Sequence, residues 1–219
     1  MSPSLTTTTA EEVVIPFGSL RLFGTLTVPD GARGVVLFAH GSGSSRLSPR
    51  NRFVADVLAR AVIGSLLFDL LTDREADNRA NVFDIGLLAE RLRRARSWIG
   101  GRAQTAQLTI GYFGASTGAA AALLAAADAP DVSAVVSRGG RPDLAGDALA
   151  RVTAPTLLIV GGADRHALEL NELALAQLSC VKQLAVVPGA THLFEEPGTL
   201  EQVADLAAGW FGRYLLTAP

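Results

Sequence analysis

Cysteine, histidine and methionine are scarce in this chain of 219 residues, which has one cysteine, three histidines and one methionine. Because Cys180 is alone, no disulfide can form within the chain, and a reducing, cytoplasmic setting is expected. The sequence has neither a cysteine pair nor a His-x-x-x-His spacing. We therefore expect no metal site.

Long apolar runs and an excess of charge are also missing. The longest apolar run, residues 119–127, is mostly alanine and far shorter than the ~20 residues of a membrane span. No Lys or Arg precedes Arg21, so the basic part of a secretory signal is absent. The net charge of −2 gives no attraction to nucleic acid or to an anionic membrane. The expected partner is a small molecule, and the oligomeric state is left open.

What is present is enough apolar material for one sizeable core. At 49% hydrophobic residues, a chain of this length is expected to form a single domain. Residues 1–11 lack periodic apolar positions and are expected to be a flexible tail, which leaves 12–219 as the domain.

Short β-like runs alternate with helical periodicities along that domain. Strands are expected at residues 12–17, 20–28, 35–39, 65–71, 108–113, 132–136, 155–160 and 183–187, and helices at 49–63, 81–99, from 117 onward, 168–178 and 200–216, with a polar loop at 72–80. Gly18 and Ser19 join the first two runs and favour an antiparallel hairpin. The alternation predicts a mostly parallel, doubly wound α/β sheet with this hairpin on its leading edge.

One turn has the pattern of a catalytic nucleophile. Gly114-Ala115-Ser116-Thr117-Gly118 stands between an expected strand and an Ala/Leu-rich helix. In this G-x-S-x-G pattern a serine is held in a strained turn, and the flanking glycines let strand and helix approach closely. A glycine-flanked turn with an incidental serine is the plainer alternative. The strand before and the helix after are the context that the motif requires.

Loops that follow parallel strands meet at one edge of the sheet, and three of them contain Ser116, Asp164 and His192. In acyl transfer Ser116 would attack, His192 would accept its proton, and Asp164 would orient the imidazole. Asp143, one strand earlier, is an alternative acid.

Other groups are less suitable for these two roles. His40 opens a glycine-rich loop and His166 lies at an expected helix start, so His192 is the better base. Glu195 and Glu196 are too close to His192 along the chain to be the first choice of acid.

Two backbone N–H groups are expected to form the oxyanion hole, those of Thr117 and Ser42. Gly41 and Gly43 allow the backbone of the second loop to turn inward. A phosphate-binding glycine loop is the alternative, but neither G-x-x-x-x-G-K-[ST] nor G-x-G-x-x-G occurs in the sequence.

From about residue 14 to 216 the sequence resembles the dienelactone-hydrolase-like branch of the α/β-hydrolases. The resemblance rests on His40-Gly41-Ser42-Gly43-Ser44, Gly114-Ala115-Ser116-Thr117-Gly118, Gly161-Gly162-Ala163-Asp164 and Gly189-Ala190-Thr191-His192. It implies an α/β-hydrolase fold and cofactor-free hydrolysis of carboxylic esters. The loop after the sixth strand is short, so no large cap is expected. Dienelactone hydrolase has a cysteine nucleophile, whereas Ser116 stands in the elbow here, which favours a general carboxylesterase.

The leading interpretation is a serine hydrolase that cleaves small carboxylic esters through an acyl-enzyme intermediate. A thioesterase, a peptidase or a perhydrolase could use the same triad. The fold also supports non-catalytic ligand-binding proteins, which keep the pocket but turn nothing over.

Four arginines follow strands near the expected site and are candidate substrate-binding groups, namely Arg46, Arg50, Arg138 and Arg141. Guanidinium groups facing a cleft would attract an anionic substrate. The alternative is a structural ion-pair network with Asp69, Asp73 and Asp143, which lie on loops at the same edge.

Overall fold

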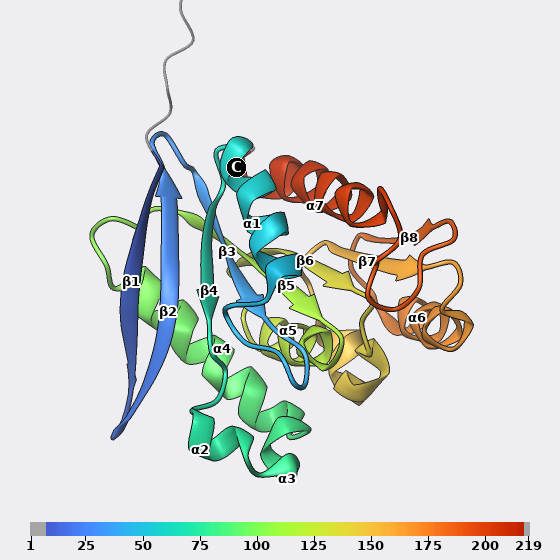
Figure 1. Ribbon diagram of the computed structural model, residues 1–219, viewed down its shortest axis with the longest axis horizontal. Helices are drawn as coiled ribbons and strands as arrows, with labels where there is room; N and C mark the ends of the chain where they lie inside the picture. The colour runs from blue at the N-terminus through green and yellow to red at the C-terminus, as the bar shows by residue number, and fades with distance from the viewer. Residues whose placement is uncertain (1–7, 217–219) are drawn as a thin grey trace, which may run out of the picture.

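One mixed sheet of eight strands runs through the protein, in the order β1-β2-β4-β3-β5-β6-β7-β8 (Figure 1). The computed structural model describes residues 8–216. The strands are β1 (Thr8–Phe17), β2 (Leu20–Pro29), β3 (Gly34–Ala39), β4 (Gly64–Phe68), β5 (Thr109–Ala115), β6 (Val132–Arg138), β7 (Thr156–Gly161) and β8 (Lys182–Val187). β2 pairs antiparallel with both β1 and β4, and the other pairs are parallel. The predicted α/β-hydrolase sheet with its antiparallel hairpin is confirmed.

Helices cover both faces of the sheet. They are α1 (Pro49–Arg60), α2 (Asp73–Ala76), α3 (Arg79–Val82), α4 (Ile85–Gly100), α5 (Thr117–Ala127), α6 (Arg165–Gln177) and α7 (Thr199–Leu215), with a 3₁₀-helix η1 (Pro142–Arg151). In Figure 1, α1 and α7 lie on one face, whereas α4 and α5 lie on the other. Among the described residues, no helix combines the length and the apolar character needed to span a bilayer.

Alternation along the central strands divides the core into two layers. All six residues of β3 are buried. Val35 and Leu37 belong to the cluster under α4 and α5, whereas Val36 and Phe38 belong to the cluster under α1 and α7. A strand covered on both faces is therefore apolar throughout, which is why β3 reads as an unbroken apolar run in the sequence.

The first strand starts earlier than the sequence pattern indicates. β1 begins at Thr8, and Glu11 lies opposite Leu26 in its ladder with β2. Glu11 also forms an ion pair with Arg102 at 2.9 Å. Residues 8–11 therefore belong to the sheet and not to the expected flexible tail. The sequence pattern misses them because backbone pairing does not need an apolar pattern. Residues 1–7 and 217–219 lie outside the described part of the chain.

The segment after β4 is the largest local difference from the sequence prediction. The expected polar loop at 72–80 contains α2 and the start of α3, and the expected helix at 81–99 begins at Ile85 instead. Asp84 caps that helix by accepting a hydrogen bond from the Leu87 N–H at 2.9 Å. α2 is held by a capping box in which Thr72 and Glu75 exchange hydrogen bonds.

The connection between β6 and β7 is short, as expected. It contains only η1, and the strands resume at Thr156. The prediction that no large cap covers the carboxyl edge of the sheet is therefore confirmed for the described chain.

Candidate active site

Ser116 occupies the turn between β5 and α5 in a conformation that non-glycine residues rarely adopt. Its φ is 52° and its ψ is −122°. The Ser116 N–H donates to the Arg138 carbonyl at 3.2 Å, and the Ser116 carbonyl accepts from the Ala119 and Arg141 N–H groups at 3.1 Å. Strain of this kind persists only where the surroundings fix the backbone, and it is concentrated at functional sites.

His192 and Asp164 are in direct contact. The imidazole Nδ1 lies 2.7 Å from Asp164 Oδ2, and Asp164 Oδ1 accepts a hydrogen bond from the Ala167 N–H at the start of α6. The hydrogen bond from Ala167 orients the Asp164 carboxylate, and that carboxylate orients the His192 ring. Nε2 is then the nitrogen left available for proton transfer.

The loops that contain Ser116 and His192 both contact residues 138–139. A Cβ on Gly139 would lie 2.8 Å from the His192 carbonyl oxygen and 3.8 Å from His192 Cε1. The carbonyl oxygen of the preceding residue, Arg138, accepts a hydrogen bond from the Ser116 N–H. On the other side, a Cβ on Gly41 would lie 2.9 Å from Ser116 Cβ. The structure therefore gathers Ser116, His192 and the loop after β3 around one point.

The alternative acids are engaged elsewhere. Both carboxylate oxygens of Asp143 accept from the Arg141 guanidinium, at 2.9 and 2.8 Å. Glu196 accepts from the N–H and hydroxyl of Thr191, and so closes the loop that presents His192. These hydrogen bonds lower the pKa of Glu196.

The two residues expected at the oxyanion hole are brought together. The Ser42 N–H donates to Thr117 Oγ1 at 3.0 Å, which ties the loop after β3 to the first residue of α5. The Thr117 N–H lies at the N-terminus of α5, where backbone N–H groups have no partner within the helix.

His40 has a structural function that the sequence interpretation missed. Its Nε2 accepts the Leu70 N–H at 3.0 Å, and its Nδ1 lies 3.1 Å from the Gly41 carbonyl. The ring thus joins the ends of β3 and β4 as the Nδ1–H tautomer. Burial lowers the pKa of His40, although the hydrogen bond to Gly41 and the charge of Asp69 oppose that shift.

His40→Gln is expected to reduce the loss of stability in mild acid. Because the fold lowers the pKa of His40 below its ordinary 6.5, the neutral ring stabilises the fold fully above that pH. This contribution is lost as the pH falls from there towards the folded-state pKa. A glutamine amide oxygen can accept the Leu70 N–H without titrating. Melting temperatures from about pH 7 to about pH 5 should fall less in the variant than in the wild type.

His166→Gln, at an exposed position at the start of α6, is the matched control for that experiment. Equal slopes of melting temperature against pH in the wild type and in His40→Gln would contradict the assignment of His40.

Three of the four candidate arginines have acidic partners. Arg46 donates to Asp69 through its backbone N–H and its guanidinium, both at 2.8 Å. Arg141 forms the ion pair with Asp143 described above, and Arg50 lies 3.6 Å from Glu195. The ion-pair alternative therefore fits Arg46 and Arg141. Arg138 is different, because no carboxylate within residues 8–216 pairs with it.

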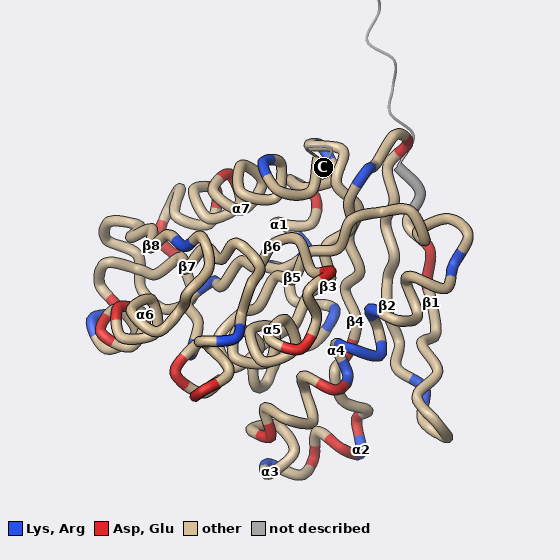
Figure 2. The backbone as a smooth tube through the Cα atoms, turned by 180° about the vertical axis from the view of Figure 1, so that it is seen from behind, with Lys and Arg blue, Asp and Glu red and all other residues tan. Residues whose placement is uncertain are grey.

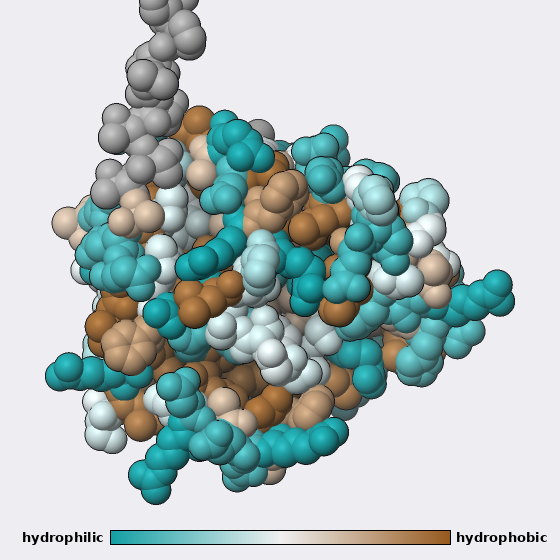
Figure 3. Space-filling view, viewed as in Figure 1, coloured by the Kyte–Doolittle hydropathy of each residue, from teal (hydrophilic) through white to brown (hydrophobic). Residues whose placement is uncertain are grey.

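A cavity of about 480 Å³ adjoins the loop after β3. It lies between that loop and the segment formed by α2, α3 and the start of α4. Its lining includes Gly41, Ser42, Leu47, Leu71, Val82 and Leu88. Figure 3 shows apolar surface in a hollow on the lower part of the face, where Figure 1 places α2 and α3.

One wall of this cavity is anchored by a buried arginine. Arg91, on α4, is 3% exposed and donates to Glu75 of α2 at 2.5 Å, while its guanidinium lies 3.7 Å from the centre of the Phe17 ring. Burial opposes ionisation of Glu75, but hydrogen bonds from Thr72 and Arg91 outweigh it and lower its pKa. These contacts fix α2 against α4 and β1.

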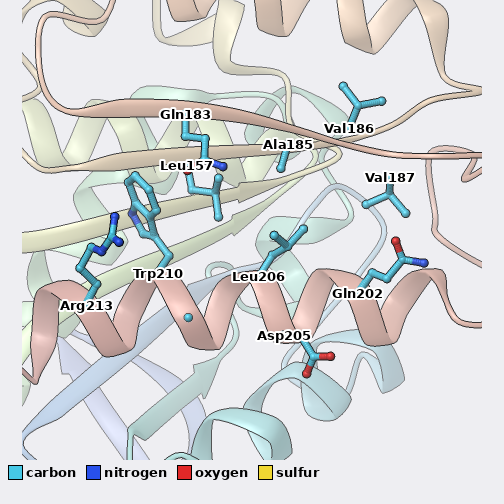
Figure 4. Close-up of a pocket in the computed structure, with 11 residues that line it drawn as sticks. Leu157, Gln183, Ala185, Val186, Val187, Gln202, Asp205, Leu206, Trp210 and Arg213 are labelled. Carbon is cyan, nitrogen blue, oxygen red and sulfur yellow. The ribbon is translucent and has the colours of Figure 1, made fainter.

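A larger cavity, of about 690 Å³, lies between α7 and the β7–β8 edge of the sheet. Figure 4 shows Leu206 and Trp210 of α7 facing Leu157, Ala185 and Val187, whereas Val186 points away. None of Ser116, Asp164 and His192 lines it. The smaller cavity is not lined by these three residues either, but its lining includes Gly41 and Ser42 of the loop after β3, which contacts Ser116.

Charge is distributed without a field of one sign. Figure 2 shows basic and acidic residues interspersed along the described chain. Within residues 8–216 no group of three or more His, Cys, Asp or Glu side chains is placed to hold a metal ion.

A solved structure decides the family. The chain is 55% identical to dienelactone hydrolase from Anabaena variabilis, with a TM-score of 0.92 over 95% of this chain and 99% of the other. The chain belongs to the dienelactone hydrolase family. Est1E from Butyrivibrio proteoclasticus shares the fold at 14% identity, with a TM-score of 0.80 over 94% of this chain and 99% of that one. No family model matches the sequence.

Two curated relatives of this dienelactone hydrolase family member have a different name. Both are proteins of Mycobacterium tuberculosis called "Putative phosphoribosyl transferase", 64% identical over 206 residues. The match covers 94% of this chain but 46% of each relative. The chain therefore spans about half the length of these curated relatives.

Proposed function

We propose that this chain is a serine hydrolase that cleaves small carboxylic esters through an acyl-enzyme intermediate. The observation that supports it best is the 2.7 Å contact between His192 and Asp164, at the edge of the sheet where Ser116 sits on a strained elbow. Its membership of a hydrolase family agrees with this chemistry at the coarser level.

Each residue has a defined task in the proposed reaction. Ser116 Oγ attacks the ester carbonyl carbon while His192 Nε2 takes the hydroxyl proton, and Asp164 stabilises the imidazolium that forms. The N–H groups of Thr117 and Ser42 stabilise the oxyanion. His192 then protonates the leaving alcohol, and a water molecule, activated by the same imidazole, releases the acid and restores Ser116.

The Ser42 N–H must exchange its present hydrogen-bond partner for the oxyanion. It donates to Thr117 Oγ1 at 3.0 Å, so an oxyanion has to compete with that hydroxyl or arrive as the threonine rotates. This exchange requires the rotation of one hydroxyl group only. Thr117 is 4% exposed and lies at the start of α5.

The cavity beside the oxyanion loop is proposed to hold the small soluble ester. A volume of about 480 Å³ fits a small ligand, and the lining combines apolar side chains such as Leu71 and Leu88 with the charged pair Arg46 and Asp69. Since no large cap covers the site, we expect short acyl chains to be preferred and no activation at an oil–water interface.

The name of the curated relatives suggests another activity, phosphoribosyl transfer. We propose that this name concerns the half of those proteins that the chain does not match, because this chain, which matches the other half, contains the G-x-S-x-G elbow of a hydrolase. A thioesterase or a peptidase would use the same residues with a different leaving group, and a perhydrolase would transfer the acyl group to hydrogen peroxide in place of water.

A series of p-nitrophenyl esters of increasing acyl length tests the proposal. We expect the highest kcat/KM with the shortest chains, and stoichiometric loss of activity on reaction with a covalent serine inhibitor. Mass spectrometry should find the inhibitor on the peptide that contains Ser116. Background rates with every ester would support the non-catalytic alternative, and faster turnover of a matched thioester or peptide would change the substrate class.

Asp164→Asn is expected to lower kcat by about 10⁴-fold, as the same change does in a serine protease, because asparagine favours the wrong imidazole tautomer. Asp143→Asn is the matched control, since that carboxylate is bound to Arg141. If Asp143→Asn has the large loss of kcat and Asp164→Asn keeps nearly the wild-type kcat, Asp164 is not the acid of the triad.

A further inference from the structure

Arg138 is a buried cation without a counter-ion. It is the last residue of β6 and is 7% exposed. Its Nη1 atom is buried and has no hydrogen-bond partner within the described chain. A desolvated guanidinium normally lies against a carboxylate or several carbonyl groups, because burying an unpaired charge is costly. Arg138 therefore lacks the anion that its environment requires.

A second cation adds to this imbalance. Alternation along β6 directs Arg138 to the face of Ala134 and Val136, under α1 and α7. Arg50, in the first turn of α1, lies close enough for its charge to act on Arg138. Burial, with a further contribution from Arg50, lowers the pKa of Arg138 to about 10. Arg50 has one acidic contact, Glu195 at 3.6 Å, and that side chain is 66% exposed.

The N-terminus of α1 contributes at the same place. The helix has twelve residues, Ser48 is its N-cap, and no acidic residue lies in its first turn. A helix N-terminus favours an anion through its dipole and its free N–H groups. Pro49 has no N–H, and the Asn51 N–H is held by the Ser48 side chain, so α1 contributes chiefly through its dipole.

These cations are next to the catalytic residues. The Arg138 carbonyl accepts the Ser116 N–H, and the following residue, Gly139, lies against His192. Glu195, the partner of Arg50, is three residues beyond His192. Backbone contacts therefore join the segment that contains Arg138 to the segments that contain Ser116 and His192.

We propose that Arg138, together with Arg50 and the N-terminus of α1, forms a subsite for a phosphate group of the substrate. A single guanidinium fork matches a planar carboxylate. Here the donors come from two separate elements, β6 and α1, and a tetrahedral phosphate offers terminal oxygens in several directions. Glu195 balances a part of the charge of Arg50, so the anion that this place lacks is chiefly the partner of Arg138. This inference rests on the proposed function and narrows its substrate to an ester that bears a phosphate.

Phosphate binding can be measured without any turnover. Thermal unfolding of the wild type and of Ser116→Ala is followed in inorganic phosphate, with potassium chloride at equal ionic strength and acetate as comparisons. We expect a saturable rise in melting temperature with phosphate and less with acetate. Arg138→Met should lose this rise, whereas Arg151→Met, an exposed arginine at the end of η1, should keep it.

The same variants separate a ligand site from a structural arginine. Removing an uncompensated buried charge should leave the melting temperature of Arg138→Met in phosphate-free buffer unchanged or raised. Arg138→Lys, which keeps the charge without the planar fork, should weaken phosphate binding about tenfold. If the methionine variant does not fold, the lysine variant replaces it in the binding test. A phosphate effect that is absent from the wild type, persists without Arg138, or is matched by acetate overturns the proposal.

Kinetics then connect the subsite to the reaction. Two aryl esters that differ only in a phosphate at the far end of the acyl chain are compared. In Arg138→Met the ratio of kcat/KM for the phosphorylated ester to kcat/KM for the neutral ester should fall about 10- to 100-fold. Equal losses for both esters contradict the subsite. No turnover of either ester, with phosphate binding retained in Ser116→Ala, would contradict the esterase proposal and leave the anion site standing.

Discussion

Ser116→Ala is expected to lower kcat/KM for a short aryl ester by about 10⁴- to 10⁶-fold, the range found when a catalytic serine is removed from other hydrolases. The change removes the attacking oxygen and leaves the backbone hydrogen bonds of the elbow in place. Alanine has to adopt the same positive φ as serine, so the strain is unchanged. The melting temperature should therefore stay close to that of the wild type.

Ser42→Ala is the matched control for the nucleophile. In the proposed mechanism Ser42 acts through its backbone N–H, which alanine retains, and its side chain is exposed. We expect kcat/KM to change by no more than about threefold, within the range of an exposed side chain that makes no transition-state contact. If Ser42→Ala is inactive and Ser116→Ala retains most of the rate, the roles of the two serines have been assigned wrongly.

The places of the candidate site residues in the fold could be predicted from the sequence because they depend on topology. In a parallel sheet the carboxyl ends of the strands share one edge, so the residues that follow β5, β7 and β8 are brought together whatever the details of packing. Ser116 follows β5 directly, whereas Asp164 and His192 lie on the loops that follow β7 and β8. Only the order of strands and helices has to be right for these residues to be selected.

The environment of each charged group could not be predicted in the same way. Arg46, Arg138 and Arg141 look alike in the sequence, and arginine is seldom fully buried. Whether each one finds a carboxylate depends on side-chain positions across different elements, as between Arg46 and Asp69. Alternation along β6 could have indicated that Arg138 faces inward, because Ala134 and Val136 are on the same face.

The sequence of the segment at 72–80 contains a signal for the start of a helix. Thr72-Asp73-Arg74-Glu75 has the spacing of a capping box, which predicts a helix start at that point. The polarity of the segment suggested a loop instead, because α2 is too short to show an apolar stripe. Its stability comes from Arg91 on α4, which is a tertiary contact.

Gly118→Ala is expected to cost about 3–5 kcal/mol of unfolding free energy, which is most of the stability of a marginal domain. A Cβ at this position would lie 2.1 Å from the Ala39 carbonyl oxygen and 2.6 Å from the His40 carbonyl oxygen. Both obstacles are backbone atoms at the end of β3, so no side chain can rotate to make room. Either α5 or the oxyanion loop must move, and ester turnover should be lost with the fold.

The matched control is Gly212→Ala in α7. A Cβ there would meet no atom within 4 Å, and the residue lies inside a helix. Alanine should stabilise that helix by about 0.5–1 kcal/mol, because it restricts the unfolded chain and has the higher helix propensity. Urea unfolding measures both variants, and their effects should have opposite signs. A Gly118→Ala protein as stable as the wild type would mean that β3 and α5 do not approach each other as closely as the structure has them, and the elbow geometry around Ser116 would need revision.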